Sequence, residues 1–336
     1  MELKMICANW EIGDVIDIKE INQGFMNKTY SLVTEGNQSY ILRLYESESD
    51  VGKVRREYEI LHYLRNCLLP FEVPIFISNK MGDYVFQLNE IIAVIMPRIK
   101  GVNLDYSNGT QAYEAGKSLG ELTKQLGQIE KGKFSEYGEN VTYDQFRFFH
   151  PSIKDINQII RKLPTTDTKI QELLTIFQQL DKEVEYYYPL LPKQYIHGDY
   201  TSGNVLCSND QINGIIDFEF YCYDVRHMDL AIAIGGGPSA LWELDPTLSN
   251  ISMLIEGYNS SVSLTEVELL SIPFLIRLRR AAMFVYFTAR YLEGLDSEGW
   301  MRGIIDWVLT SEQWLTSNKD ELIRTIIAAG TRRAQN

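Results

Sequence analysis

The chain has 336 residues, a length at which two domains are the natural expectation. Its composition, 45% hydrophobic and 23% charged, is typical of a globular protein and excludes an extensively disordered one. The formal net charge of −13 argues against a nucleic-acid-binding protein, because phosphate contacts require clustered lysine and arginine side chains. No apolar run approaches the roughly 20 residues that span a bilayer, so we expect no membrane partner.

The N-terminal segment and the cysteines indicate the cellular compartment. The first residues, MELK, lack the basic start and the apolar stretch of a secretory signal. Four cysteines are present, and no two of them form a CxxC pair: Cys7, Cys67, Cys207 and Cys222. We therefore expect a cytoplasmic protein with buried free thiols, and neither a disulfide framework nor a zinc site.

Strand signals dominate the first hundred residues. Two β-rich runs, 30–34 and 39–45, flank the turn sequence EGNQ and predict a hairpin. Apolar residues at helical spacing then predict a helix over 51–66. Two further apolar runs predict another pair of strands, at 84–88 and 91–96.

Helical patterns dominate the rest of the chain. A long helix with one apolar face is predicted at about 115–129. Further helices are predicted at 153–163, 168–187, 247–260, 265–293 and 298–328. One β interlude, 205–220, interrupts this half. The predicted outline is an α+β protein with a small β-rich lobe at 1–97, a connector at 98–102 and a larger, mainly helical lobe at 103–336.

One short segment carries the strongest chemical signal. It reads YIHGDYTSGN from residue 195 and IIDFE from residue 215. An apolar strand end delivers Asp199 into a loop, and a following hairpin is expected to bring Asn204 and Asp217 close together. Carboxylate and amide oxygens suit a hard cation such as Mg²⁺, which keeps water and substrate phosphates as its other ligands. The segment therefore predicts a magnesium site, and the alternative interpretation is a buried polar turn.

The pattern HGDxxxxN followed by IIDFE resembles the signature of the aminoglycoside phosphotransferase and choline kinase superfamily. This superfamily also includes type II homoserine kinases and methylthioribose kinase. The resemblance implies a protein-kinase-like, two-lobed fold and ATP-dependent phosphorylation of a hydroxyl group on a small molecule. Asp199 would accept or orient the proton of that hydroxyl, while Asn204 and Asp217 would hold the Mg²⁺ that bridges the ATP phosphates.

Three residues close to these motifs, His197, Gly198 and Asp229, are interpreted separately from the catalytic and metal-binding residues. We interpret His197 as a residue that maintains the shape of the loop, and not as a base. Gly198 stands where protein kinases carry an arginine. Asp229 resembles the family's later aspartate, which ties its own helix to the catalytic loop. The resemblance covers about residues 18–235, with the motifs in the family's order.

The resemblance extends to the nucleotide-binding side. The run GFMNKTY looks like the family's GxxNxxY turn, in which Gly24 and Asn27 would lie near the phosphates. Arg43 occupies the strand position where most kinases place the lysine that holds the α- and β-phosphates. Glu57, on the inward face of the next helix, looks like the glutamate that pairs with that cation.

The connector is predicted to bind adenine through its backbone. Residues 96–101 read MPRIKG and resemble the family's connector, which places Met96 and Ile99 next to the nucleotide. Only the location is inferred, because backbone hydrogen bonds depend little on side-chain identity.

The acceptor is predicted from fewer residues. Glu219 lies two residues after Asp217 and would bind an amine of the substrate or remain structural. Arg277 and Arg280, one helical turn apart, would meet a carboxylate, and an ordinary salt-bridge pair is the alternative. Tyrosines and Trp242 would instead form an aromatic cage for a quaternary amine. We favour a homoserine-like acceptor, followed by a choline-like amino alcohol.

Two other functional classes remain as alternatives. A protein serine/threonine kinase is disfavoured by Gly198 and by the lack of an Ala-Pro-Glu motif after Asp217. A non-catalytic scaffold, like the spore-coat proteins that resemble this family, is disfavoured by the retained metal-binding positions. Arg43, where lysine is usual, leaves room for the scaffold.

Overall fold

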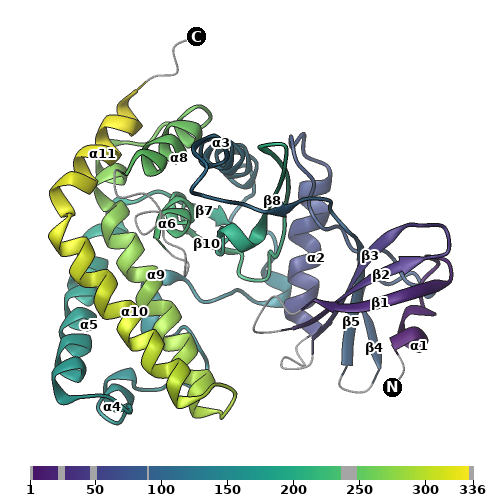
Figure 1. The fold of residues 1–336 in the computed structure, drawn as a ribbon, viewed down its shortest axis with the longest axis horizontal. Coiled ribbons are helices and arrows are strands. Elements are labelled where there is room, and N and C mark those ends of the chain that lie inside the picture. The colour runs from purple at the N-terminus through teal and green to yellow at the C-terminus, as the bar shows by residue number, and fades with distance from the viewer. Residues whose placement is uncertain (1–2, 22–26, 46–50, 89–90, 236–247, 333–336) are drawn as a thin grey trace. The chain divides into compact units, whose positions relative to one another are not determined.

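A computed structural model describes residues 3–21, 27–45, 51–88, 91–235 and 248–332 of the chain (Figure 1). The backbone divides into two compact units. Unit 1 comprises residues 1–103, 132–139 and 204–219, and unit 2 comprises residues 104–131, 140–203 and 220–336. The β interlude predicted at 205–220 thus belongs almost entirely to the same compact unit as the N-terminal strands.

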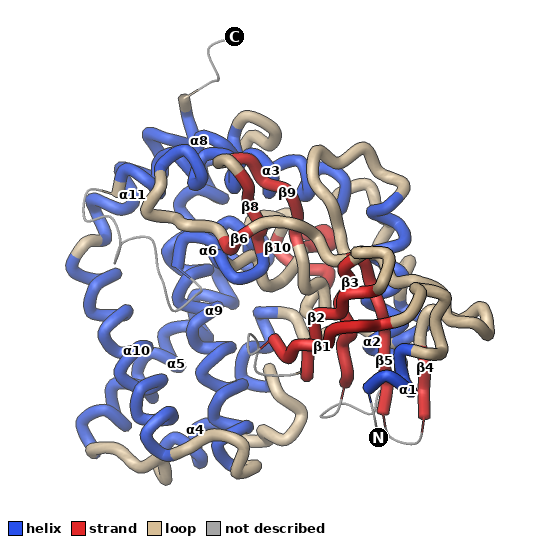
Figure 2. The backbone as a smooth tube through the Cα atoms, turned by 45° about the vertical axis from the view of Figure 1, so that its right-hand side comes forward, coloured by secondary structure: helices blue, strands red, loops and turns tan. Residues whose placement is uncertain are grey.

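Unit 1 is built on a five-stranded antiparallel sheet of order β1-β2-β3-β5-β4, whose strands lie side by side in Figure 2. The strands are β1 (Val15–Ile21), β2 (Lys28–Thr34), β3 (Ser39–Tyr45), β4 (Phe86–Leu88) and β5 (Ile91–Pro97). The predicted hairpin of β2 and β3 is confirmed. The strand predicted from residue 84 begins only at Phe86. One face of the sheet is buried by apolar side chains at alternate positions, including Leu42 and Leu44.

Two helices, one 3-10 turn and a small second sheet complete unit 1. They are α1 (Leu3–Cys7), α2 (Val51–Arg65), η1 (Ser135–Tyr137), β6 (Val102–Asn103), β8 (Val205–Ser208) and β9 (Gln211–Ile215), and η4 (Ser202–Asn204) leads into β8. The helix predicted over 51–66 is confirmed as α2. Its buried residues recur at helical spacing, which gives α2 one face packed into the unit.

Unit 2 is mainly helical. Its helices are α3 (Gly109–Leu126), α4 (Ile156–Ile160), α5 (Asp167–Tyr187), α6 (Met228–Gly235), α8 (Ser249–Asn259), α9 (Glu266–Leu292), α10 (Glu298–Ser317) and α11 (Lys319–Thr331), with the 3-10 turns η2 (Tyr143–Phe148) and η3 (Tyr188–Leu190). Strands β7 (Lys193–Ile196) and β10 (Cys222–Val225) pair antiparallel. The single helix predicted over 298–328 is wrong, because Asn318 separates α10 from α11. The Asn318 side chain donates to the carbonyl of Trp314, a local bond that competes with helix continuation.

Helix α9 is the central helix of unit 2. It begins with a capping box, in which Thr265 and Glu268 each satisfy the other's backbone amide. It contacts α5, α6, α10, α11 and η2, and α10 runs beside it in both views (Figures 1 and 2). Because it has neighbours on several sides, its successive side chains reach different elements of the unit.

The prediction of buried free thiols is confirmed in part. The four cysteines are free, but Cys67 is partly exposed and only the other three are buried. No helix in the described ranges is both long and apolar enough to cross a membrane.

Candidate active site

The β8–β9 hairpin of unit 1 carries two of the predicted site residues at its ends. The backbone carbonyl of Asn204 accepts a 2.9 Å hydrogen bond from the amide of Ile216, so the predicted approach of the hairpin ends is confirmed at the backbone. Asp217, the next residue, has a φ of +70°, in the left-handed region. Aspartate tolerates this region better than most residues, and such conformations concentrate at functional sites.

Arg43 on β3 contacts two carboxylates. Its Nη1 lies 3.3 Å from Oε1 of Glu57 on α2 and 3.1 Å from Oδ1 of Asp217. The Glu57 carboxylate also accepts a 2.9 Å hydrogen bond from the hydroxyl of Tyr45. The predicted pair of Arg43 and Glu57 is therefore present, and the end of the hairpin joins it.

The charges of this cluster do not balance. Burial disfavours the charged form of Arg43, but Asp217 and Glu57 outweigh it and raise the pKa of the guanidinium well above its usual value. Burial raises the pKa of Glu57, although Arg43 and Tyr45 favour its ionised form. One guanidinium thus faces two carboxylates, and the Asp217 side chain is 27% exposed. A cation bound at Asp217 would compensate the excess negative charge.

Asn27 contacts Glu219 within unit 1. The Nδ2 of Asn27 donates a 2.9 Å hydrogen bond to Oε2 of Glu219. This contact joins the GxxNxxY turn to the residue predicted to bind an amine of the acceptor. Gly24, from the same predicted turn, lies outside the described residues.

At the start of the connector, the two side chains predicted to lie next to the nucleotide, Met96 and Ile99, are both buried. Met96 pairs with Ile41 across the sheet, and the amide of Arg98 donates to the carbonyl of Ser39. Among the described residues, the next amide, that of Ile99, has no hydrogen-bond acceptor. A ligand with an acceptor nitrogen would satisfy it.

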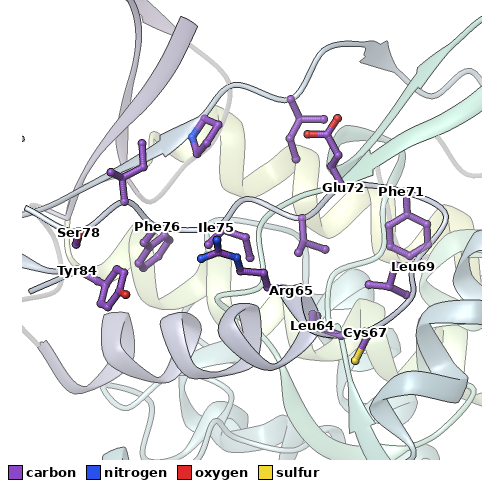
Figure 3. A pocket seen from close by; sticks show the side chains of 14 residues that line it. Leu64, Arg65, Cys67, Leu69, Phe71, Glu72, Ile75, Phe76, Ser78 and Tyr84 are labelled. Carbon is purple, nitrogen blue, oxygen red and sulfur yellow. The ribbon is translucent and has the colours of Figure 1, made fainter. Parts of the chain in front are cut away.

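The Ile99 side chain lines a cavity of about 630 Å³ in unit 1 (Figure 3). The cavity lies between the end of α2, the segment that follows it and the connector, with Leu64 and Phe76 among its apolar walls. None of the other predicted nucleotide-binding residues lines it. Sequence patterns gave no sign of this cavity, because most of its lining residues lie in the segment 67–78, which has no helix or strand periodicity.

In unit 2, Asp229 organises the loop that follows β7. Its two carboxylate oxygens accept the amides of His197 and Gly198 at 2.7 and 2.8 Å. His197 is buried, and its Nδ1 accepts the amide of Asp199 at 3.1 Å. The structural interpretations of Asp229 and His197 are thus confirmed.

Gly198 is required by the loop geometry. Its φ is +82°, and a Cβ atom there would lie 2.2 Å from the backbone oxygen of Phe220. Any side chain would therefore displace the turn at Phe220 or the loop itself. The arginine of protein kinases does not fit at this position.

Asp199 itself is held by an arginine that the sequence analysis missed. The guanidinium of Arg279, from α9, donates to Oδ1 of Asp199 and, at 2.5 Å, to the hydroxyl of Tyr143. The segment Leu278-Arg279-Arg280 was visible in the sequence, but helical spacing alone does not identify which arginine faces the loop.

Arg277 and Arg280, the two arginines predicted to meet a substrate carboxylate, contact other elements. Arg277 pairs with Glu183 of α5 and, at 2.8 Å, with Glu312 of α10, so the salt-bridge alternative holds for it. Arg280 is buried, donates from Nε to the carbonyl of Gly235 at 2.8 Å and lies over the ring of Trp307. A substrate role of Arg280 stays a prediction. Trp242 lies outside the described residues.

Comparisons with known proteins identify the family of the chain. The profile described as "Phosphotransferase enzyme family" matches residues 17–262. A homoserine kinase of Zymomonas mobilis is 28% identical over 315 residues, covering 92% of this chain and 87% of the relative. A homoserine kinase of Beijerinckia indica is 27% identical and covers 82% and 81% of the two chains.

Solved structures share the fold at low sequence identity. A microcompartment-associated aminopropanol kinase superposes with a TM-score of 0.74 at 17% identity, covering 94% of this chain and 97% of the other. A choline kinase from Cryptosporidium parvum gives a TM-score of 0.63 at 14% identity, with coverages of 98% and 99%. These likenesses confirm the predicted protein-kinase-like α+β fold. Since the family profile spans more than half of the chain, this protein belongs to the phosphotransferase enzyme family and is a small-molecule kinase that acts on a hydroxyl group.

Proposed function

We propose that this kinase transfers the γ-phosphoryl group of ATP, with Mg²⁺ as the metal, to the hydroxyl of a homoserine-like or amino-alcohol acceptor. The observation that carries the proposal is the buried cluster of Arg43, Glu57 and Asp217, in which one cation serves two carboxylates. The cluster has an excess negative charge, and one of its carboxylates, Asp217, is partly exposed. Such a cluster suits a site that receives a metal–triphosphate complex.

The nucleotide is proposed to bind to unit 1. Arg43 contacts the α- and β-phosphates, and Glu57 holds the guanidinium in place for that contact. The Ile99 amide donates to the adenine ring, with Met96 beside it. Gly24 and Asn27 belong to the turn that approaches the phosphates. Residues 98–102 then act as the connector between a nucleotide-binding lobe, 1–97, and an acceptor-binding lobe, 103–336.

Asn204 and Asp217 are the proposed metal ligands. Both offer oxygen atoms, and Mg²⁺ is commonly held by one or two carboxylate or amide oxygens together with water and phosphate oxygens. Bound there, the metal would neutralise charge on the transferring phosphoryl group. The donor set fits Mg²⁺ better than it fits a soft metal, since neither ligand is a thiol or an imidazole.

Asp199 is the proposed catalytic residue. Its carboxylate orients the acceptor hydroxyl and takes its proton as the acceptor oxygen bonds to the γ-phosphorus. The bond between the γ-phosphorus and the β–γ bridging oxygen breaks, and ADP leaves with that oxygen. The proton on Asp199 is then released to solvent.

The acceptor class rests on the relatives. Two relatives are named homoserine kinases and one structural neighbour is named an aminopropanol kinase. Homoserine and amino alcohols share an amine and a hydroxyl, and we propose Glu219 as the partner of the amine. Arg280 is the proposed partner of a carboxylate, a group that amino alcohols lack.

An ADP-release assay with ATP and Mg²⁺ tests the proposal. L-homoserine, 1-amino-2-propanol, ethanolamine, choline and an aminoglycoside are compared as acceptors. Turnover with homoserine or an amino alcohol, reduced in Asp217→Asn, is the expected result. Nucleotide binding without turnover on any of these compounds would contradict the acceptor class. Calorimetry showing no binding of ATP with Mg²⁺ would contradict the kinase reaction and favour the scaffold.

A further inference from the structure

We propose that Arg279 is a positioning residue of this kinase, which holds the Asp199 carboxylate in the orientation that the acceptor hydroxyl requires. The inference rests on the proposed role of Asp199. Arg279 lies 80 residues from Asp199 in the sequence and reaches it from α9.

The contacts of Arg279 enclose the loop that carries Asp199. Its Nη2 donates to Oδ1 of Asp199, and its Nη1 donates to the Tyr143 hydroxyl at 2.5 Å and to the Gly198 carbonyl at 3.4 Å. The Tyr143 hydroxyl in turn donates to the same Gly198 carbonyl at 2.7 Å. The Arg279 guanidinium thus binds both the backbone carbonyl of Gly198 and the side chain of Asp199.

Tyr143 is itself held firmly. Its backbone amide donates to Oδ2 of Asp224 at 2.7 Å, and its ring stacks on Phe149 with centroids 5.1 Å apart. The ring also faces the Arg279 guanidinium, 5.7 Å from its centroid. The contacts with Tyr143 therefore hold Arg279 in place independently of Asp199.

Both burial and donor geometry favour an arginine at position 279. The Arg279 side chain is only 4% exposed, so its charge requires a counter-ion close by. Although burial disfavours the charged form, Tyr143 and Asp199 raise the pKa of Arg279 above its usual value. A planar group with several donors can bind Tyr143, Gly198 and Asp199 together, whereas a lysine ammonium has a shorter reach and a different geometry.

The consequence for the reaction is positional. A carboxylate bound through one oxygen by a fixed guanidinium cannot rotate freely, so its second oxygen keeps a defined direction. Displacement of a reacting group by about 1 Å costs on the order of 100-fold in rate. Loss of Arg279 should therefore lower kcat, and it should leave nucleotide binding nearly unchanged because the nucleotide groups belong to unit 1.

The test compares Arg279→Ala, Arg279→Lys and Tyr143→Phe with Arg277→Ala. Arg277 lies on the same helix and also forms ion pairs, but with α5 and α10. We expect Arg279→Ala to lower kcat by about 100-fold, with the KM for ATP within about threefold of wild type. Arg279→Lys should retain more activity than Arg279→Ala, Tyr143→Phe should show a smaller loss, and Arg277→Ala should keep the wild-type kcat.

Chemical rescue separates positioning from a purely structural role. Millimolar guanidinium should raise the kcat of Arg279→Ala in a saturable manner, and the same concentration of potassium ion should not. A kcat of Arg279→Ala within threefold of wild type would overturn the proposal, as would a folded variant that guanidinium does not rescue. If Arg279→Ala fails to fold, wild-type kcat in both Arg279→Lys and Tyr143→Phe overturns it. Wild-type protein without turnover on any acceptor would instead contradict the proposed function.

Discussion

Arg43 and Asp217 lie 3.1 Å apart through Nη1 and Oδ1, although 174 residues separate them in the chain. The contact joins the third strand of the sheet to the end of the β8–β9 hairpin. It places the proposed phosphate-binding cation against the proposed metal ligand. The variants below test what this contact and the loop around Asp199 contribute.

The Arg43 cation should be essential for both folding and nucleotide binding. Arg43→Met leaves Glu57 buried without a counter-ion, which should lower the free energy of unfolding by about 3–5 kcal/mol. Arg43→Lys should keep most of that stability and raise the KM for ATP, because lysine lacks bidentate contacts. Urea unfolding and steady-state kinetics measure the two effects.

Arg55→Met is the matched control for Arg43. Arg55 pairs with Asp83 at 2.7 Å, but both side chains are more than one-third exposed. Its loss should change the free energy of unfolding by less than about 1 kcal/mol. Equal effects of the two methionine variants would contradict the buried cluster.

Asp217 should determine the metal requirement. Asp217→Asn removes one negative charge from the proposed Mg²⁺ site, so the half-saturating Mg²⁺ concentration should rise by about tenfold or more and kcat should fall. A titration of activity against Mg²⁺ at saturating ATP measures the change. Asp210→Asn, in the turn at the other end of the same hairpin, should behave as wild type. An unchanged Mg²⁺ titration for Asp217→Asn would rule out Asp217 as a ligand.

Gly198 should be intolerant of any side chain. Gly198→Ala places Cβ 2.2 Å from the Phe220 oxygen and forces alanine into a positive φ, which alone costs about 1–2 kcal/mol. With the steric clash, the free energy of unfolding should fall by about 3 kcal/mol. In Gly203→Ala, the nearest atom to the new Cβ is 3.8 Å away, so that variant should lose less than about 1 kcal/mol. Thermal or urea unfolding of both proteins decides the comparison.

Asp224 should make stability depend on pH. Burial raises the pKa of Asp224 to about 6 in the folded protein, against about 3.9 in an unfolded chain. The folded state therefore binds this proton more tightly, so the contribution of Asp224 is fully present below about pH 4 and is lost as the pH rises through about 6. The difference in unfolding free energy between wild type and Asp224→Asn should fall by about 2 kcal/mol from pH 4 to pH 7. Parallel stability curves would show that Asp224 titrates normally.

Local sequence patterns predicted the local structure well. The turn between 30–34 and 39–45 and the apolar spacing of α2 involve neighbouring residues, and their elements are confirmed. The break between α10 and α11 was missed because a single asparagine does not interrupt an apolar period. The spacing from Asp199 to Asn204 and Asp217 also located the proposed chemistry.

Which arginine of α9 contacts Asp199 depends on how the helix packs in unit 2. A helix turns by about 100° per residue, so Arg277, Arg279 and Arg280 point in three directions. The apolar spacing was enough to predict the helix, and the residues at 277, 279 and 280 show that it carries three cations. Only the packing of α5, α6, α10 and η2 around it selected Arg279 for the loop, because contacts across the fold are absent from any local period.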